Sequence, residues 1–184
     1  MTAGAVEVFP ADAARWDDLA ELFASSPTTS GCWCMWPRRP PGAHRDDPAN
    51  RDELQALVRS ASPPGLVAYR EGRAVGWCAV GPRSAFPQYA DESAPGAWAI
   101  ACIFVAADAR GAGVARLLVE AAVGYAARCG ATTVDGPPPW WLPDGTDAKA
   151  AAAEQLRACG FKEIAPGARM PVLRIATSNE EAGE

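Results

Sequence analysis

The chain has 184 residues, of which 49% are hydrophobic and 21% charged, a composition typical of one globular domain with a sizeable core. Its formal net charge is -5, and three of the acidic groups lie among the last five residues. No basic cluster favours nucleic acid, no apolar run reaches the roughly 18 residues of a membrane span, and the N-terminus does not resemble a secretory signal. We therefore expect a cytoplasmic protein with reduced cysteines and without nucleic-acid or membrane partners.

Hydrophobic periodicity predicts six to seven strands and about four helices. Strands are expected at 6–9, 66–69, 74–80, 98–105, 132–135, 161–164 and 171–175, and helices at 12–23, 50–60, 114–129 and 149–159. Asp12 and Asn50 are positioned as helix N-caps. The strands at 66–69 and 74–80 flank a tight turn and predict a hairpin, and the last two strands are expected to be antiparallel. This order predicts an α/β arrangement with a mixed sheet.

Two proline-containing stretches, 25–48 and 136–147, are expected to be long loops, which in compact domains are often functional. The whole chain is expected to form a single domain over residues 1–176. Residues 177–184 are predicted to be an acidic, flexible tail.

One segment has the pattern of an anion-binding loop. Arg110-Gly111-Ala112-Gly113-Val114-Ala115 joins the apolar strand 98–105 to the most regular helix, whose first backbone N–H groups have no intrahelical partner. The two glycines let phosphate oxygens approach the backbone, and Arg110 and Arg116 add positive charge. A P-loop requires a lysine that is absent here. A dinucleotide-binding loop follows the first strand, whereas this loop follows the fourth or fifth. For these six residues alone, a glycine-rich turn without a ligand remains an equal alternative.

The stretch 105–118 resembles the acetyl-CoA motif of the GNAT acetyltransferase superfamily, with its Arg/Gln-x-x-Gly-x-Gly/Ala core. Other stretches resemble one bacterial branch of that superfamily, namely Cys32-Trp33-Cys34-Met35, 64–69, 76–83 and Gly160-Phe161. The resemblance covers about residues 31 to 175. It implies the GNAT fold, with a mixed, mostly antiparallel sheet of about six to seven strands flanked by about four helices.

The resemblance also implies an N-acetyltransferase that uses acetyl-CoA as co-substrate, with direct attack by the amine of a small molecule. Ile103, Phe104 and Val105 would lie beside the pantetheine arm, and a backbone N–H near Val105 would polarise the thioester carbonyl. The pyrophosphate would be held by Arg110, Gly111, Ala112, Gly113, Val114, Ala115 and Arg116. No metal is expected. Dimers are common among similar proteins, so a homodimer is among the expected partners.

The chain departs from the family pattern at the positions that transfer protons. Many relatives have a tyrosine shortly before the late Gly-Phe, where this chain has residues 155–157, Gln-Leu-Arg, and strand 98–105 contains no Asp or Glu. Asp135, at a strand end, and His44, the only histidine, are therefore the predicted catalytic residues. The alternatives are a solvated strand-end carboxylate and a surface histidine. These departures also leave open an acyl-CoA-binding sensor with degenerate catalysis, beside a protein N-acetyltransferase.

Five loop and strand-end residues are assigned to the acceptor site: Trp33, Trp36, Arg83, Trp140 and Trp141. Aromatic walls suit a flat or apolar acceptor, and Arg83 suits an acceptor carboxylate. Ordinary core packing of the tryptophans and a solvated Arg83 are the alternatives.

Cys32 and Cys34 flank Trp33 and raise the question of a metal or a nucleophile. A Cys-x-Cys pair with one distant histidine matches a zinc site poorly, and no base is adjacent in sequence to activate a thiol. We therefore interpret this stretch as an apolar plug that shapes the acceptor pocket.

Overall fold

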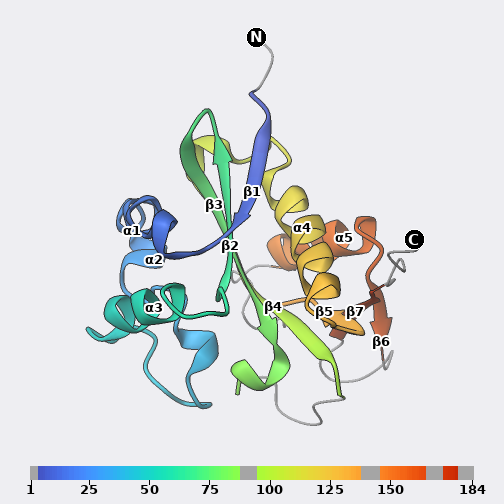
Figure 1. Cartoon of the computed structure of the whole chain (residues 1–184). Coiled ribbons are helices and arrows are strands. Elements are labelled where there is room, and N and C mark those ends of the chain that lie inside the picture. Colours follow the sequence, from blue (N-terminus) through green and yellow to red (C-terminus); the bar gives the residue numbers. More distant parts are fainter. Residues whose placement is uncertain (1–3, 88–94, 138–145, 165–171, 178–184) are drawn as a thin grey trace, which may run out of the picture.

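The computed structural model describes residues 4–87, 95–137, 146–164 and 172–177, and a single seven-stranded sheet runs through its centre (Figure 1). The strand order is β1-β2-β3-β4-β5-β7-β6. The strands are β1 (Val6–Pro10), β2 (Gly65–Arg70), β3 (Arg73–Pro82), β4 (Ala97–Val105), β5 (Thr133–Asp135), β6 (Lys162–Ile164) and β7 (Val172–Ala176). All neighbours are antiparallel except β4 and β5, which are parallel. The prediction of a mixed, mostly antiparallel sheet is confirmed.

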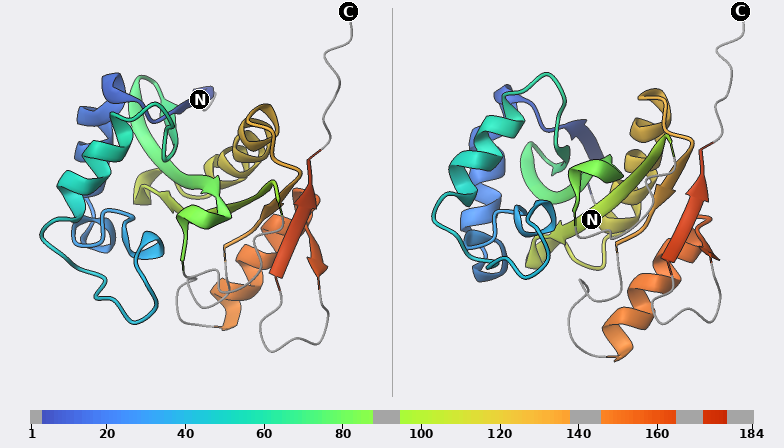
Figure 2. Two further views of the ribbon diagram at one scale, coloured as in Figure 1. Left: turned by 60° about the horizontal axis from the view of Figure 1, so that its bottom comes forward. Right: turned by 90° about the horizontal axis from the view of Figure 1, so that it is seen from below.

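Helices cover both faces of the sheet. They are α1 (Trp16–Ala24), α2 (Pro27–Ser30), α3 (Asn50–Val58), α4 (Val114–Arg128) and α5 (Thr146–Ala158). The views of Figures 1 and 2 place α1, α2 and α3 on one face and α4 and α5 on the other. Phe23 of α1 packs on Trp77 of β3, and Leu118 of α4 lies against the adjacent Gly76 from the opposite face; both side chains are fully buried. Burying each such side chain contributes about 1.5–3 kcal/mol.

Two predicted helix caps have different outcomes. The Asp12 side chain accepts a hydrogen bond from the Ala14 backbone N–H, but it caps a short 3-10 turn, and α1 itself begins at Trp16. The prediction that Asn50 caps the second helix is wrong, because the N-cap of α3 is Ala49. A carboxylate oxygen of Asp47 accepts the Ala49 N–H instead.

Asn50 is fully buried and fastens the long loop that precedes α3. Its side-chain amide donates to the carbonyl oxygens of Gly31 and Arg45, each at 3.0 Å, and its carbonyl accepts from Arg39 at 3.0 Å. Burial of a polar side chain costs little free energy when such hydrogen-bond partners replace water. The predicted loop 25–48 is therefore ordered, and it also contains α2 and a 3-10 turn at Trp36–Arg38.

The residue that follows the C-terminal strand β7 is hydrogen bonded to the segment just before β5. The Thr177 N–H donates to the Thr132 carbonyl at 3.1 Å, and the Thr177 hydroxyl donates to the carbonyl of Ala131. Thr177, the first residue of the predicted tail, is thus bonded to the start of β5, and the remainder of that tail lies outside the described residues. Within the ranges given above, no helix combines the length and the apolar character that a membrane crossing requires.

Two glycine-to-alanine substitutions test the packing of the sheet. At Gly65 of β2, a Cβ would overlap the Cys78 carbonyl and lie 2.6 Å from the Trp77 ring, so Gly65→Ala should destabilise the fold by about 1–3 kcal/mol. At Gly124 of α4, the nearest atom is the flexible end of Arg128 at 3.4 Å, so Gly124→Ala should stabilise by about 0.5–1 kcal/mol. Urea unfolding followed by circular dichroism measures both. Equal midpoints for the two variants would contradict the packing at Gly65.

Candidate functional site

The N-terminus of α4 is an uncapped helix end that faces open space. Gly113 is the N-cap residue, has a φ of 77°, and offers no side chain to the first amides of the helix. Gly111 has the same φ, a left-handed conformation that strongly favours glycine. A Cβ at either glycine would meet nothing within 4 Å. The first N–H groups of this 15-residue helix are thus available to an anion, as the sequence pattern predicts.

The other residues of the predicted pyrophosphate loop divide into backbone and side-chain contributors. Val114 is buried in the core, so only its main chain can face a ligand. The Arg110 guanidinium donates through Nε to the Val105 carbonyl at 3.2 Å. Arg116 is exposed and bonded to Glu120, one helical turn further, at 2.8 Å. The anion site therefore consists of main-chain amides, with two guanidinium groups held close to it.

Beside this loop, the sheet opens along one edge of β4. Strand β5 pairs with β4 only at Ala97, Trp98 and Ala99, whereas β3 follows β4 as far as Val105. No β5 residue in the described ladder reaches the part of β4 that contains Ile103 and Val105. The main-chain groups on that edge can thus bond an extended ligand.

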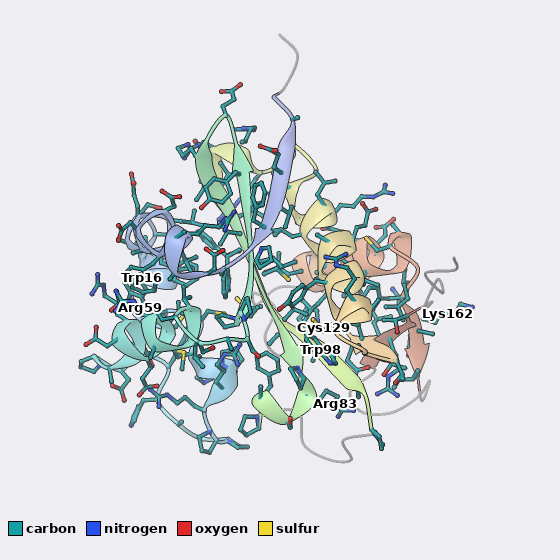
Figure 3. All side chains as sticks on the ribbon, in the orientation of Figure 1. Trp16, Arg59, Arg83, Trp98, Cys129 and Lys162 are labelled. Atoms are coloured by element: carbon teal, nitrogen blue, oxygen red, sulfur yellow. The ribbon has the colours of Figure 1, made fainter. Side chains whose placement is uncertain are left out.

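The side chains of β4 face both sides of the sheet, and an irregularity at Ala101, which is skipped in the register with β3, reverses the alternation along the strand. Trp98 packs edge-on against Tyr125 of α4 at 5.9 Å, as Figure 3 shows for the labelled Trp98 beside α4. Phe104 packs against Phe23 of α1 at 6.4 Å, on the opposite face. Phe104 is therefore largely a core residue, and its backbone is the part that can border the predicted pantetheine arm.

Asp135 lies in a buried ion-pair cluster on the α1 side of the sheet. It pairs with Ala99 in the register, one position beyond Trp98, so its side chain points away from α4. Arg174 of β7 binds both carboxylate oxygens, with Nε 2.5 Å from Oδ1 and Nη2 3.0 Å from Oδ2. Arg83, at the end of β3, places Nη1 3.3 Å from Oδ2. The bidentate contact with Asp135 raises the pKa of Arg174.

The cluster unites two residues to which the sequence assigns different roles. Asp135 is a predicted catalytic residue and Arg83 a predicted acceptor contact, and the structure joins them directly. No sequence pattern indicates Arg174. The signal that identifies it is the register of β5 and β7, which places it opposite Asp135, and that register requires knowledge of the strand order.

The predicted aromatic residues of the acceptor site have separate environments. Trp33 is only 8% exposed and stacks on Trp16 of α1 at 6.1 Å, so it contributes mainly to the core. Trp36 is half-buried in the 3-10 turn, whereas His44, a predicted catalytic residue on the same loop, is exposed. Trp140 and Trp141 lie outside the described residues.

The structure also brings together two thiols that are distant in sequence. Cys34, from the long loop, lies beside Cys102 of β4, whose thiol hydrogen bonds to it. From the sequence, Cys102 is expected only to be a small apolar residue of a buried strand. Within the part of the chain that the structure describes, no group of three or more His, Cys, Asp or Glu side chains is arranged to hold a metal ion.

Comparison with known proteins gives one family and many similar folds. The model of the acetyltransferase (GNAT) family matches residues 16–135. No curated protein matches the sequence significantly.

Three similar solved structures show the range of proteins that share this fold. The yncA protein of Salmonella typhimurium, a putative acetyltransferase solved with its cofactor acetyl-CoA, is 17% identical over 98% of both chains, with a TM-score of 0.59. A ribosomal-protein-alanine N-acetyltransferase from Brucella melitensis is 22% identical over 91% of this chain and 96% of its own, with a TM-score of 0.58. Diaminobutyrate acetyltransferase from Paenibacillus lautus, in complex with its substrate and coenzyme A, is 13% identical over 95% and 96%, with a TM-score of 0.55.

The buried cluster generates a stability prediction. Asp135→Asn leaves two guanidinium groups without their carboxylate in a buried setting, so the free energy of unfolding should fall by about 3–5 kcal/mol. Asp108→Asn is the control, because its ion pair with Arg73 is largely exposed and should be worth less than about 1 kcal/mol. Urea unfolding followed by tryptophan fluorescence compares them. A loss at Asp135 no larger than that at Asp108 would show that the cluster does not stabilise the fold.

Proposed function

Because this chain belongs to the acetyltransferase (GNAT) family, we propose that it binds acetyl-CoA and transfers the acetyl group to the amine of a small molecule. The observation that carries the proposal is the uncapped N-terminus of α4 next to the open edge of β4. An anion site adjoining an exposed strand edge suits a ligand with a pyrophosphate at one end and amide groups along its arm.

The residues present fit acetyl-CoA. The pyrophosphate would be bound by the amides of residues 111–115, where the two glycines leave room for it, with Arg110 and Arg116 beside it. The pantetheine arm would bond the main chain of Ile103, Phe104 and Val105. When bound, acetyl-CoA supplies an acetyl group activated as a thioester.

The chain's own contribution to the reaction is mainly positioning and polarisation. Backbone N–H groups on the open edge near Val105 would bond the thioester carbonyl, as an oxyanion hole does. The amine would attack directly, without a covalent enzyme intermediate. Holding the two reactants in contact can contribute up to about 7–11 kcal/mol to lowering the barrier.

Asp135 and His44 are the proton acceptors proposed from the sequence, and the structure gives each a distinct setting. Both oxygens of Asp135 already accept from Arg174, and one also faces Arg83, so an amine would have to displace or join a guanidinium group. His44 is exposed on the long loop. With these partners, Asp135 is also suited to orient Arg83 toward the acceptor.

A compact acceptor is favoured by the way the long loop is fastened at the end of β3. Arg38 of the loop donates to the Pro64 carbonyl at 3.0 Å, just before β2, and its guanidinium lies 4.6 Å from the centre of the Phe86 ring. These contacts hold the loop beside the segment that follows Arg83, which supports a compact acceptor there rather than an extended polypeptide. The similar proteins include an enzyme for diaminobutyric acid and one for a ribosomal protein, and at their low identities they share the fold alone.

Substitution of one glycine tests the donor site. Gly113→Asp places a carboxylate where the pyrophosphate should bind, so calorimetry should show acetyl-CoA affinity reduced at least about a hundredfold. Gly130→Asp is the matched control, because Gly130 is also left-handed, also faces open space, and ends the same helix. It should bind acetyl-CoA as the wild type does. Equal affinity for both variants would refute the loop assignment.

An acceptor panel tests the activity. Thiol release from acetyl-CoA, followed with a chromogenic disulfide, should depend on the addition of one or more small amines, such as amino acids, diamines or arylamines. Release that depends only on peptides would favour a protein N-acetyltransferase. Tight acetyl-CoA binding with no acceptor-dependent release would favour the acyl-CoA-binding sensor.

A further inference from the structure

A pair of free thiols lies at the end of the site where acetyl transfer would occur. Cys34 is buried, 3% exposed, and Cys102 is partly exposed on β4. The Cys102 thiol hydrogen bonds to the Cys34 sulfur. Cys102 immediately precedes Ile103, on the part of β4 that β5 does not pair with. The pair therefore lies where the open edge of the strand begins.

The pair faces the acceptor side of the sheet. In the register of β3 and β4, Trp77 is opposite Phe104 and Ala79 is opposite Cys102, so Cys102 and Phe104 share a face. Phe104 packs on Phe23 of α1, which makes this the face opposite α4. The side chain of Asp135 points to the same face.

The backbone at Cys34 is held in an unusual conformation. Trp33 and Cys34 both have left-handed φ values, 42° and 55°. For residues other than glycine, such a conformation costs on the order of 1–3 kcal/mol and persists only when the surroundings enforce it. Here the Trp33 ring is fixed by Trp16 and Phe23, so the following thiol is directed at the sheet. Strain of this kind is frequent at functional sites.

A buried indole points at the same sulfur. Trp77 is 1% exposed, and its Nε1–H has no nitrogen or oxygen partner in the described parts of the chain. The Cys34 sulfur is the group that it can bond. An orphaned buried N–H costs about 1–3 kcal/mol, and a thiolate at Cys34 would satisfy it better than a thiol.

A guanidinium group lies near the two thiols. Arg38 is largely buried, and among the described residues it forms no ion pair with Asp or Glu. Burial lowers the pKa of Arg38, and the charge of Cys34 opposes that change. The groups that face Cys34 are Cys32, Arg38 and Arg45 of the loop, Trp77 of β3 and Cys102 of β4. Cys78 follows Trp77 on β3, so its side chain points to the opposite face, and it interacts with Cys34 through charge alone.

These neighbours shift the pKa values of the two thiols in opposite directions. The hydrogen bond from Cys102, the nearby N–H of Trp77 and the charges of the two guanidinium groups lower the pKa of Cys34 despite its burial. Donation to Cys34, together with burial, raises the pKa of Cys102 well above its ordinary value. Paired groups whose environments move them apart are suited to act as base and acid.

We propose that Cys34 and Cys102 form the proton relay of the acetyl transfer, in which Cys34 takes the amine proton and Cys102 protonates the departing sulfur of coenzyme A. This proposal rests on the proposed function. It fills the two roles for which the sequence has neither a strand carboxylate nor the expected tyrosine.

The relay balances over one turnover. The amine nitrogen forms a bond to the acetyl carbon, and the bond from that carbon to the coenzyme A sulfur breaks. The amine proton passes to the Cys34 thiolate, and the Cys102 proton passes to the coenzyme A thiolate. A proton then crosses from Cys34 to Cys102 along their hydrogen bond, which restores both. Protonation of Cys34 removes the charge that raises the pKa of Cys102, so the second transfer becomes easier once the first has occurred.

The first test is direct and does not need turnover. Cys129→Ser removes the exposed thiol. Of the thiols that remain, Cys32, Cys78, Cys102 and Cys159 all have pKa values above the ordinary value, chiefly because of burial or, for Cys102, its hydrogen bond to Cys34. Thiolate absorbance at 240 nm should therefore show a single thiol titrating below pH 9. This signal should vanish in Cys34→Ser/Cys129→Ser. No thiolate below pH 9 in folded Cys129→Ser would overturn the relay.

The second test uses kinetics with the best amine from the acceptor panel. Cys34→Ala should lower kcat by about 10²–10⁴-fold while acetyl-CoA affinity, measured by calorimetry, changes less than about threefold. Cys78→Ala is the matched control for loss of a buried thiol, and it should keep the kcat of the wild type. Because the base works unprotonated, wild-type kcat/KM should fall as pH drops through the pKa of Cys34. That limb should be absent in Cys34→Ser.

The outcomes separate the relay from the function on which it rests. Wild-type kcat in Cys34→Ala with an unchanged pH profile would overturn the relay and leave acetyl transfer intact. Loss of the acidic limb in Asp135→Asn rather than in Cys34→Ser would assign the base to Asp135 and overturn it as well. Absence of turnover in the wild type counts against the proposed function, whereas the 240 nm titration still reports on the thiolate.

Discussion

The parallel pairing of β4 with β5 stops after Ala99. Both the proposed acetyl-CoA site and the proposed acceptor site depend on this early separation of the two strands. A sheet that continued would satisfy the main-chain groups of β4 as far as Val105. Instead, among the described strands β3 alone accompanies β4 to its end, and the chain then leads through a short 3-10 turn to the N-terminus of α4. The result is a strand edge near a helix end, each with backbone groups that a ligand can bond.

The proposed donor site and the proposed acceptor site differ in the groups that form them. The proposed donor site would use main-chain amides of one continuous segment, so its side chains matter chiefly by being small at Gly111 and Gly113. The proposed acceptor site would use side chains from segments far apart in sequence, which meet only because the sheet aligns them. Asp135, Arg83 and Arg174 come from three strands or strand ends, and their burial makes each charge dependent on the others.

This division explains what the sequence can predict. The strands and helices along the chain and the apolar stripe of α4 are local patterns with periods of two or 3.6 residues, and the glycine loop before α4 is a local motif; the structure confirms the fold they imply. At Asn50, a polar residue before an apolar stripe has the signature of a helix cap, whereas its amide in fact binds loop carbonyls 19 and five residues away. Arg174 and Cys102 carry no local signal, because their roles depend on strand register and on a loop that folds back on the sheet.

The buried charges of the acceptor face constrain one another. A guanidinium group as enclosed as that of Arg38 is costly without a compensating anion, and its contacts with Pro64 and the Phe86 ring supply only partial charges. A thiolate at Cys34 would compensate it and at the same time accept the orphaned N–H of Trp77. A neutral thiol would leave both needs unmet. The groups around Cys34 therefore favour the charged form of its side chain, and a base maintained in this way requires no carboxylate on β4.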